Sequence, residues 1–380
     1  MASAHHIACL CGTIRQDVPL RAQRDSDQVS LSLCHCNTCR HSSGVLCTSY
    51  YPIATPVLSQ HLRTYVSPGG SRRYFCAVCG CHVFRSKMTS PEPPEWEVAT
   101  GVIASSTGGA PEARYTRHIH VADTKDGGAS VWIPSLDGWP TKLASTSPPE
   151  NPPATRQPNT PSPSPRLPAS CACGSVRFHI TRPSPQSHLP HSSYPDLTHA
   201  YKTTPAVLGG NPGRDKWWIR PGGRYLAGTC ACASCRLSTG FEIQEWAFVP
   251  RCNIFLHVPC RGHREGGQEE DAVMPLDFEA LPEGILTSYS SSPGVVREFC
   301  AGCGATVFWH DGIRPGVIDV SVGLLRAEDG ARAEGWLRWW TGRVSFEEET
   351  ETGREGAAAR TARGLIGALE EGLRGWERSV

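Results

Sequence analysis

The feature that most constrains this sequence is the number and spacing of its cysteines. The 380-residue chain contains 18 cysteines, and most of them fall in short clusters separated by one or two residues. The chain is long for a disulfide-stapled mini-protein, and its first residues lack the cationic and apolar segments of a secretion signal. In a reducing compartment, clustered cysteines more often bind metal than form disulfides. The clusters therefore predict metal sites, and we expect a cytoplasmic protein, with a nuclear location left open.

The cysteine clusters occur twice, in the same order. The first motif is Cys-x-Cys-Gly, the second is Cys-x-Cys-x-x-Cys-Arg, and the third is Phe-Cys-x-x-Cys-Gly. The motifs start at Cys9, Cys34 and Phe75 in the first copy, and at Cys171, Cys230 and Phe299 in the second. Three motifs in matching order predict a tandem duplication.

This repeat predicts how the chain is organised. The segments are a first zinc β domain at 1–144, a Pro/Ser-rich linker at 145–170, a second zinc β domain at 171–346, and a tail at 347–380 that is expected to be helical. A segment of this composition cannot bury enough apolar surface to fold. The intervals between motifs are longer in the second copy, which indicates insertions near 183–223 and 261–283. We expect both insertions to be surface loops.

The apolar periodicity predicts a mainly β fold with a short C-terminal helix. Alternating or β-prone residues favour strands at 96–99, 118–121, 175–180 and 318–322. Leu365, Leu369, Leu373 and Trp376 recur at helical spacing, so they predict one apolar helix face. Four glycines in the same stretch weaken that helix.

Four cysteines of each copy can form a closed metal site. Residues i and i+2 of a strand point to the same side, so Cys9 and Cys11 can direct both sulfurs at one point. The Cys76–Cys79 turn offers a second pair, and four thiolates complete a tetrahedral structural zinc site. The corresponding set in the second copy is Cys171, Cys173, Cys300 and Cys303.

The middle motif leaves three thiolates without a fourth partner. These are Cys34, Cys36 and Cys39 in the first copy, and Cys230, Cys232 and Cys235 in the second. A zinc ion with three protein ligands keeps an open position, as catalytic zinc sites do. A thiol bound there would be deprotonated. We therefore take these six cysteines as candidate catalytic residues and expect two zinc ions per domain, four per chain.

A closed middle site is the alternative. The candidate fourth ligands in the first copy are His35, Cys47, Cys81 and His82. The second copy has Ala231, Ala305 and Thr306 at the positions of His35, Cys81 and His82, so a geometry common to both copies would not need these three. Cys47, Cys252 and Cys260 are expected to be free buried thiols. Arg40 and Arg236 follow the middle motif, where each either offsets thiolate charge or is an ordinary exposed arginine.

The charge of the chain excludes two classes of partner. With 37 basic and 36 acidic side chains, the formal net charge is only +1. This balance lacks the basic footprint of a nucleic-acid-binding protein. No apolar run is long enough to span a bilayer. We therefore expect neither a nucleic-acid nor a membrane partner, and protein partners remain unassigned.

These motifs resemble the glutathione-dependent formaldehyde-activating enzyme family, which also includes centromere protein V. The resemblance covers Cys9 to about Pro134 and Cys171 to about Phe346. It implies Mss4-like domains of coiled antiparallel sheets, each with a four-cysteine structural zinc and a three-cysteine zinc near the substrate. The implied activity is that of a carbon–sulfur lyase, which joins glutathione and formaldehyde as S-hydroxymethylglutathione. No motif of this chain identifies a glutathione pocket.

Three functional hypotheses follow. The first is an enzyme that binds a small thiol on the open three-cysteine zinc and adds it to, or releases it from, an aldehyde such as formaldehyde. The second is a non-catalytic, zinc-stabilised interaction module. The third is redox sensing by the thiolates, which zinc would partly protect. The sequence assigns no general acid or base.

Overall fold

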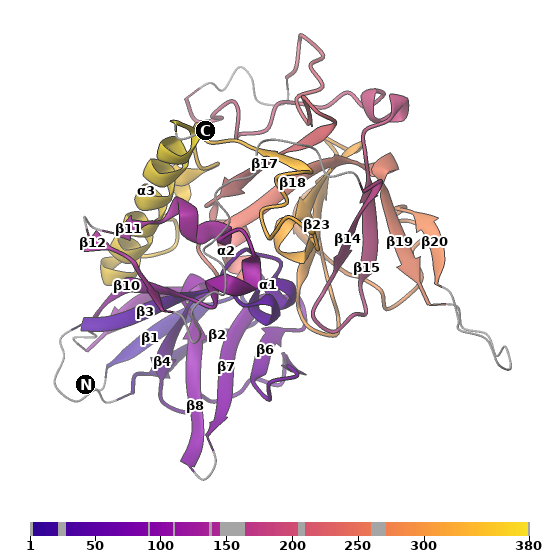
Figure 1. The fold of residues 1–380 in the computed structure, drawn as a ribbon. Coiled ribbons are helices and arrows are strands. Elements are labelled where there is room, and N and C mark those ends of the chain that lie inside the picture. The colour runs from indigo at the N-terminus through magenta and orange to yellow at the C-terminus, as the bar shows by residue number, and fades with distance from the viewer. Residues whose placement is uncertain are drawn as a thin grey trace, which may run out of the picture.

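The computed structural model describes residues 3–21, 28–89, 92–108, 111–136, 139–144, 164–203, 210–259 and 271–378. The fold is mainly β, with antiparallel sheets and a helix near the C-terminus, so the predicted fold class is confirmed. We call residues 3–144 the N-terminal half and residues 164–378 the C-terminal half. In Figure 1 the N-terminal half, in indigo to magenta, lies below the C-terminal half.

The N-terminal half contains three main sheets. Its elements are β1 (Ala4–Ala8), β2 (Arg15–Pro19), β3 (Gln28–Cys34), α1 (Asn37–Ser43), β4 (Tyr50–Ile53), β5 (Leu62–Val66), β6 (Arg72–Cys76), β7 (His82–Thr89), β8 (Glu92–Ala99), β9 (Ile103–Thr107), β10 (Glu112–Ile119), β11 (Ser135–Leu136), β12 (Trp139–Pro140) and β13 (Lys142–Ala144). The strand orders are β2-β1-β9, β4-β8-β7-β6-β5 and β13-β10-β3, and the last sheet is parallel.

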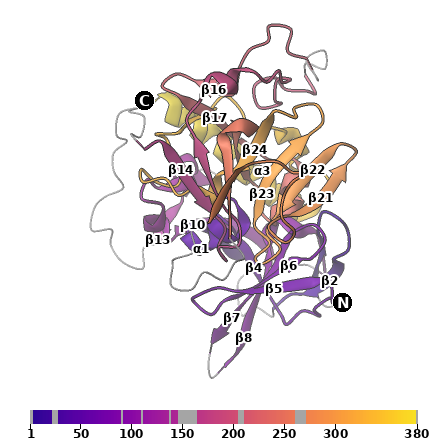
Figure 2. The ribbon, with the colours of Figure 1, turned by 90° about the vertical axis from the view of Figure 1, so that its right-hand side faces the viewer.

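The C-terminal half contains one large sheet and a smaller, four-stranded one. Its elements are β14 (Arg166–Ser170), β15 (Arg177–Thr181), β16 (Ile219–Arg220), β17 (Arg224–Cys230), α2 (Ala233–Thr239), β18 (Gln244–Pro250), β19 (Ile254–Val258), β20 (Ala272–Pro275), β21 (Thr287–Ser292), β22 (Val295–Phe299), β23 (Thr306–Asp311), β24 (Val317–Ser321), β25 (Leu337–Trp339) and α3 (Gly356–Arg378). The main sheet has the order β16-β17-β18-β24-β23-β22-β21, with β25 parallel to β17. Figure 2 shows β21, β22, β23 and β24 next to one another.

The two halves share the same local unit around the middle cysteine motif. In each, a strand ends at the first cysteine, a seven-residue helix follows, and a glycine in the left-handed conformation ends the helix, Gly44 in one half and Gly240 in the other. A side chain at either glycine would meet a backbone carbonyl of the opposite half, Thr306 or His82. Glycine is therefore required both for the turn and for the close approach of the halves.

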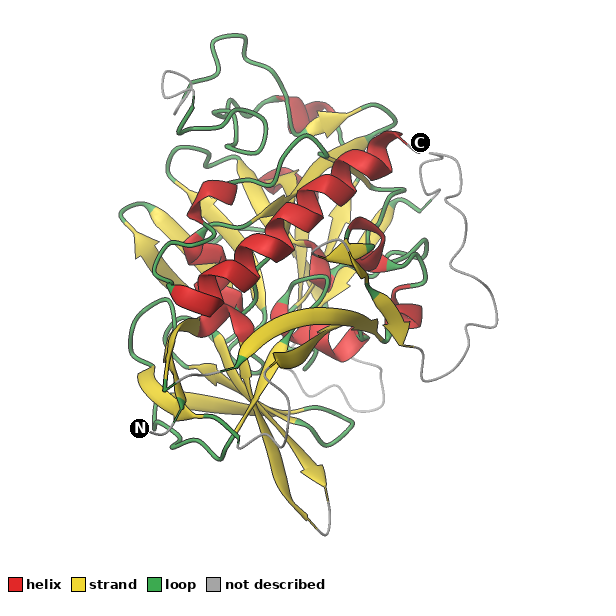
Figure 3. Cartoon of the chain, turned by 90° about the vertical axis from the view of Figure 1, so that its left-hand side faces the viewer, coloured by secondary structure: helices red, strands yellow, loops and turns green. Residues whose placement is uncertain are grey.

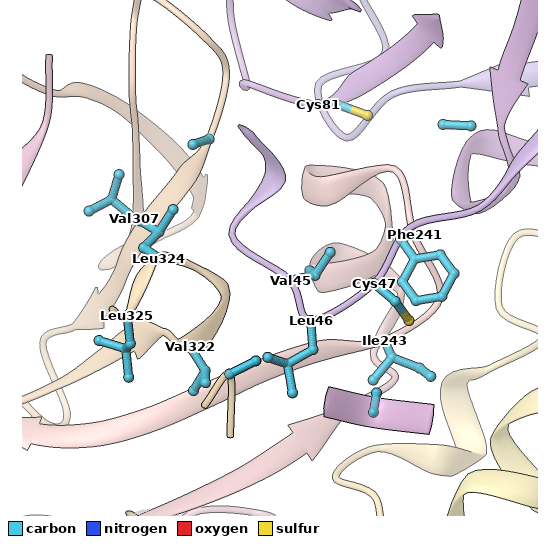
Figure 4. Packing of buried hydrophobic residues seen from close by; sticks show 14 of the residues in the cluster. Val45, Leu46, Cys47, Cys81, Phe241, Ile243, Val307, Val322, Leu324 and Leu325 are labelled. Carbon is cyan, nitrogen blue, oxygen red and sulfur yellow. The ribbon is translucent and has the colours of Figure 1, made fainter. Parts of the chain in front are cut away.

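The halves pack against each other through one continuous core. A single cluster of buried apolar side chains includes residues of both halves. Figure 4 shows its centre, where Val45 and Cys47 lie near Phe241 and Ile243. Cys47 is fully buried and lies outside the converging cysteine groups found among the described residues, so it is a free buried thiol as expected. Cys252 is also free, but it is exposed, so the expectation of burial is wrong there.

Hydrogen bonds across the boundary are reciprocal. The amide of Leu10 donates to Leu237 at 3.2 Å, and the amide of Ala172 donates to His41 at 2.8 Å. Gly101 and Gly323 likewise donate to Gly240 and Gly44, at 2.9 and 3.0 Å. Each half thus uses the same surface to contact the other, as the partners of an isologous dimer do.

The predicted linker and insertions contain more structure than expected. Residues 166–170 form β14, which pairs with β15, whereas 145–163 lie outside the described residues. In the second insertion, β20 pairs with β19, so the expectation of a loop is wrong there; Cys260 and its neighbours to 270 lie outside the described residues. The described part of the first insertion buries Leu197 and Trp218 against the C-terminal half. Both insertions are partly structured because they bury apolar side chains.

The C-terminal helix is docked rather than frayed. The α3 helix packs on β9 and β10 and crosses one face of the molecule in Figure 3. Leu365, Leu369 and Leu373 are fully buried, as the periodicity predicted. Strands were also found where predicted in 96–99, 177–180 and 318–321, but the segment 118–121 leaves the strand after Ile119. No helix in the described part of the chain is long and apolar enough to span a membrane.

Candidate metal centres and an adjoining chamber

The structure brings together the two predicted sets of four cysteines. The sulfurs of Cys9, Cys11, Cys76 and Cys79 lie within 4.8 Å of one another, as do those of Cys171, Cys173, Cys300 and Cys303. Zinc–sulfur bonds of about 2.3 Å in a tetrahedron place sulfurs about 3.8 Å apart. The Cys9–Cys11 and Cys11–Cys76 sulfur distances are 3.5 and 3.6 Å, far longer than a disulfide bond of about 2.05 Å. Both sets therefore fit a tetrahedral thiophilic metal.

The first pair of each set comes from a turn, which corrects the expectation of a strand. The β1 strand ends at Ala8, and Cys9 and Cys11 lie in the connection to β2. The Gly12 amide donates to the Cys9 carbonyl at 3.1 Å, and the Ile14 amide donates to the Cys9 sulfur at 3.4 Å. The tight turn, rather than the pleat of a strand, aims the two sulfurs at one point. The connection between β14 and β15 does the same for Cys171 and Cys173.

The three cysteines of each middle motif also converge. Cys34 ends β3, Cys36 caps α1 and Cys39 lies in its first turn. The Cys34 and Cys39 sulfurs are 3.4 Å apart, and the Cys39 amide donates to the Cys36 sulfur at 3.3 Å. We call this set the first triad. The second triad, Cys230, Cys232 and Cys235, has the same placement on β17 and α2.

No fourth ligand joins either triad among the described His, Cys, Asp and Glu side chains. His35 is not among the side chains that converge with the sulfurs, and it hydrogen-bonds His118 at 2.8 Å. His82 hydrogen-bonds the Ser42 carbonyl at 2.7 Å, and Cys81 contacts the His82 carbonyl at 3.5 Å. The alternative of a site closed by one of these side chains is therefore not realised in this conformation.

A buried arginine faces each triad, and sequence reasoning missed both. Arg73 donates to the Cys39 sulfur at 3.2 Å, and the two terminal nitrogens of Arg297 lie 3.7 and 3.6 Å from the Cys235 sulfur. Burial alone would lower the pKa of Arg73, but the Cys39 thiolate and Tyr50 raise it. Three thiolates on a divalent ion leave a net negative charge, which such a cation offsets. The available signal was an arginine three residues before both Cys-x-x-Cys pairs.

The arginines that follow the middle motif form hydrogen bonds with oxygen acceptors instead. Arg40 donates to the Asn37 side chain at 2.6 Å, and Arg236 donates to the Gly101 carbonyl of the opposite half at 2.5 Å. Both are buried, with 4% and 2% exposure, so they are not ordinary surface arginines. Neither donates a hydrogen bond to a sulfur in the described structure. They stabilise the helix start and the boundary between the halves.

A chamber of about 360 Å³ opens beside the second triad. All three cysteines of the triad line this chamber. Its aromatic lining residues are Trp246 and Phe248 of β18 and Trp309 of β23. Leu197 and Tyr201, from the first insertion, line it as well. Its size falls in the range of small-ligand pockets. The insertion thus contributes to a cavity at a candidate metal centre.

Acidic side chains hold the start of both triad helices. Asp123 accepts from the Asn37 amide at 3.0 Å, and Glu349 accepts from the Ala233 amide at 3.2 Å. Glu349 also lines the chamber, and burial followed by the charge of Cys232 raises its pKa. Neither residue could be assigned to a triad from the sequence, because both lie far from the triads along the chain.

Comparison with known proteins relates part of the chain to one family. No curated protein and no solved structure matches the chain. Residues 4–123 match the family model described as glutathione-dependent formaldehyde-activating enzyme. This segment contains the first four-cysteine set, the first triad and Asp123. The match and the sulfur geometry together relate the N-terminal half to the glutathione-dependent formaldehyde-activating enzyme family.

Proposed function

We propose that the protein is a zinc-dependent, carbon–sulfur lyase-like enzyme. It binds a small thiol of the glutathione type at an open three-cysteine zinc, and it adds that thiol to an aldehyde such as formaldehyde or releases it. The two four-cysteine sets hold structural zinc, and the two triads hold open zinc, four ions in total. The family match at residues 4–123 supports this assignment for the N-terminal half.

The observation that carries the proposal is the second triad at the wall of a cavity. Three sulfurs converge, no described His, Cys, Asp or Glu completes the set, and a chamber of about 360 Å³ adjoins them. A structural zinc site is closed, whereas a catalytic one keeps a position for an exogenous ligand. The same observation disfavours a purely structural interaction module, which needs no such space.

The side chains around the triad suit thiol addition. Zinc bound there would supply an open position that holds a thiol as its thiolate. Arg297 offsets the negative charge of the sulfurs, and the aromatic wall offers apolar surface to a bound ligand. In the reaction a sulfur–carbon bond forms, the carbonyl π bond breaks, and the proton lost by the thiol ends on the former carbonyl oxygen. The reverse step releases both reactants.

We also propose that the chain arose by tandem duplication of one domain. The supporting observations are the matching order of motifs, strands and helices, the equivalent triad geometry and the reciprocal contacts. Under this proposal the domains span 1–144 and 171–346, with β14 added to the second.

The test is product formation with isotope-labelled formaldehyde and glutathione, followed by NMR. We expect the hemithioacetal product, S-hydroxymethylglutathione, to form faster with the zinc-loaded protein than without it. A Cys36→Ser, Cys232→Ser double variant should lose at least about 100-fold of this acceleration, because each triad loses a ligand. A variant that keeps the four-cysteine zinc ions and full acceleration would refute the proposal.

A further inference from the structure

The walls of the two triads differ in chemistry at equivalent positions. The residue paired across the sheet with Arg73 is Arg85, and the one paired with Arg297 is Trp309. The Arg85 guanidinium lies 4.2 Å from the Tyr50 ring centre and bonds Glu97 at 2.6 Å. At the position of Tyr50 the C-terminal half has Trp246, paired with β24 as Tyr50 is paired with β8. The second triad therefore faces indoles where the first faces a guanidinium and a phenol.

The charged groups that line the chamber already have partners within the protein. Arg314 forms a two-pronged ion pair with Asp319, at 3.0 and 3.2 Å. Asp311 accepts from the Arg314 amide at 2.6 Å, and Glu349 accepts from the Ala233 amide at 3.2 Å. Arg297 faces the Cys235 sulfur.

The remaining acid of the chamber also has partners within the protein. Asp196 pairs with Arg343 at 3.1 Å and accepts from the amides of Tyr201 and Phe346, each at 2.8 Å. Arg297 and Arg314 are the only cationic side chains among the described residues of the lining, and both are engaged. A ligand that enters this space meets no free cation there.

Burying an ionised carboxylate without a partner is costly. Glutathione carries two carboxylates, and the described lining offers neither of them a free arginine or lysine. An aromatic or aliphatic body, in contrast, gains from burial against Trp246, Phe248 and Trp309.

We propose that the chamber at the second triad binds a thiol with an uncharged, apolar body, such as an arylalkyl thiol, in preference to glutathione. The proposal rests on the thiol-binding function proposed above and specifies its substrate class for this half of the chain. The sulfur lies at the triad, and the apolar body lies against the indoles. The aldehyde partner then meets the thiol in the same space.

The experiment measures binding of phenylmethanethiol and of glutathione to the zinc-loaded full-length protein by isothermal titration calorimetry. We expect phenylmethanethiol to bind at least about tenfold more tightly, since an aromatic contact and an avoided buried charge each contribute. Trp309→Ala should weaken phenylmethanethiol at least about tenfold, and Trp309→Phe should restore most of the loss. Glutathione binding should be weakened much less by Trp309→Ala, because a charged tripeptide gains little from contact with the indole.

The matched control is Trp96→Ala, which removes an indole of the N-terminal half that packs against Tyr74. It should leave phenylmethanethiol affinity within twofold of the wild type. Native mass spectrometry of each variant verifies that all four zinc ions are retained. Equal effects of the two alanine variants, or glutathione binding that Trp309→Ala weakens as much as phenylmethanethiol binding, would overturn this inference and leave the proposed function standing. Failure of both thiols to bind the four-zinc protein would overturn the proposed function together with the inference.

Discussion

At the scale of single residues, Arg297 is the side chain outside the three cysteines whose removal should affect the second triad. Hydrogen bonds from Cys230 and Cys232, and then the charge of Arg297, lower the pKa of the Cys235 thiol. Arg297→Met should therefore lower zinc affinity at this triad by about 10- to 100-fold, the usual cost of losing an outer partner of a ligand. The measurement is the number of zinc ions that native mass spectra show after chelator competition, and three should remain.

Arg73→Met provides the matched control for that experiment. The pKa of the Cys39 thiol is lowered first by hydrogen bonds from Cys34 and Cys36, and then by the charges of Arg73 and Arg85. Because Arg85 remains, we expect the first triad to keep its zinc at chelator concentrations that empty the second triad of Arg297→Met. Equal loss in the two variants would show that the difference in nearby charge is irrelevant.

Glu245 predicts a pH dependence of stability. This carboxyl is fully buried and accepts from the Leu46 amide of the opposite half at 2.8 Å, and burial raises its pKa from 4.5 to about 8. Between these two pH values the unfolded chain releases a proton that the folded chain keeps, so the wild type loses stability as the pH rises. Glu245→Gln cannot ionise, so its melting temperature relative to wild type should increase by a few degrees from pH 5 to pH 8.

Differential scanning fluorimetry with saturating zinc measures this difference, and the subtraction removes the pH dependence that both proteins share. Glu279→Gln, at an exposed position, serves as the control and should show a flat difference. A flat difference for Glu245→Gln as well would mean that this carboxyl is ionised in the fold.

The grouping of cysteines could be predicted from sequence because it depends on short spacings. Cys34, Cys36 and Cys39 are held by a strand end and one helical turn, both local structures. Arg297 and Trp309 reach the second triad only through strand pairing more than 60 residues further along the chain. A single sequence does not reveal such pairings, so the chamber and its charge balance could not be predicted.

At the scale of elements, the glycines of α3 illustrate the limit of propensity arguments. A side chain at Gly372 would press on the Trp132 carbonyl, whereas one at Gly367 would meet nothing within 4 Å. Gly367→Ala should therefore stabilise the protein by roughly 0.5–1 kcal/mol, the helix-propensity difference. Gly372→Ala should destabilise it, because the helix must move away from η3 (Gly128–Trp132). Urea unfolding measures the change in the free energy of unfolding for both variants. A Gly372→Ala variant more stable than the wild type would contradict this packing.

Element boundaries were the least predictable part of the fold. The apolar face of α3 follows from its periodicity, but the turn that carries Cys9 and Cys11 looks like strand from the spacing of its cysteines alone. Residues 166–170 were assigned to the linker because Pro and Ser dominate that region, yet Leu167 and Ala169 alternate inward and form β14. Tertiary pairing overrides composition at such edges.

At the scale of the whole molecule, the shared core predicts that the halves depend on each other. Leu46 and Cys47 pack in the same apolar cluster as Phe241 and Ile243, and reciprocal backbone hydrogen bonds cross the boundary. Either half alone would expose this apolar surface to water, at a cost of about 25 cal/mol per Å². We therefore expect residues 1–144 or 164–380, expressed singly, to aggregate or to lose cooperative unfolding.

A protease site placed within 145–163 tests this dependence without separate expression. If the core, rather than the connecting chain, holds the halves together, the cut protein should elute at the size of the intact one and retain all four zinc ions. Its melting temperature should fall and become dependent on protein concentration, because unfolding now releases two chains. Separation of the halves on cleavage, with each still folded and metal-loaded, would show instead that they are independent domains and that the boundary contributes little to stability.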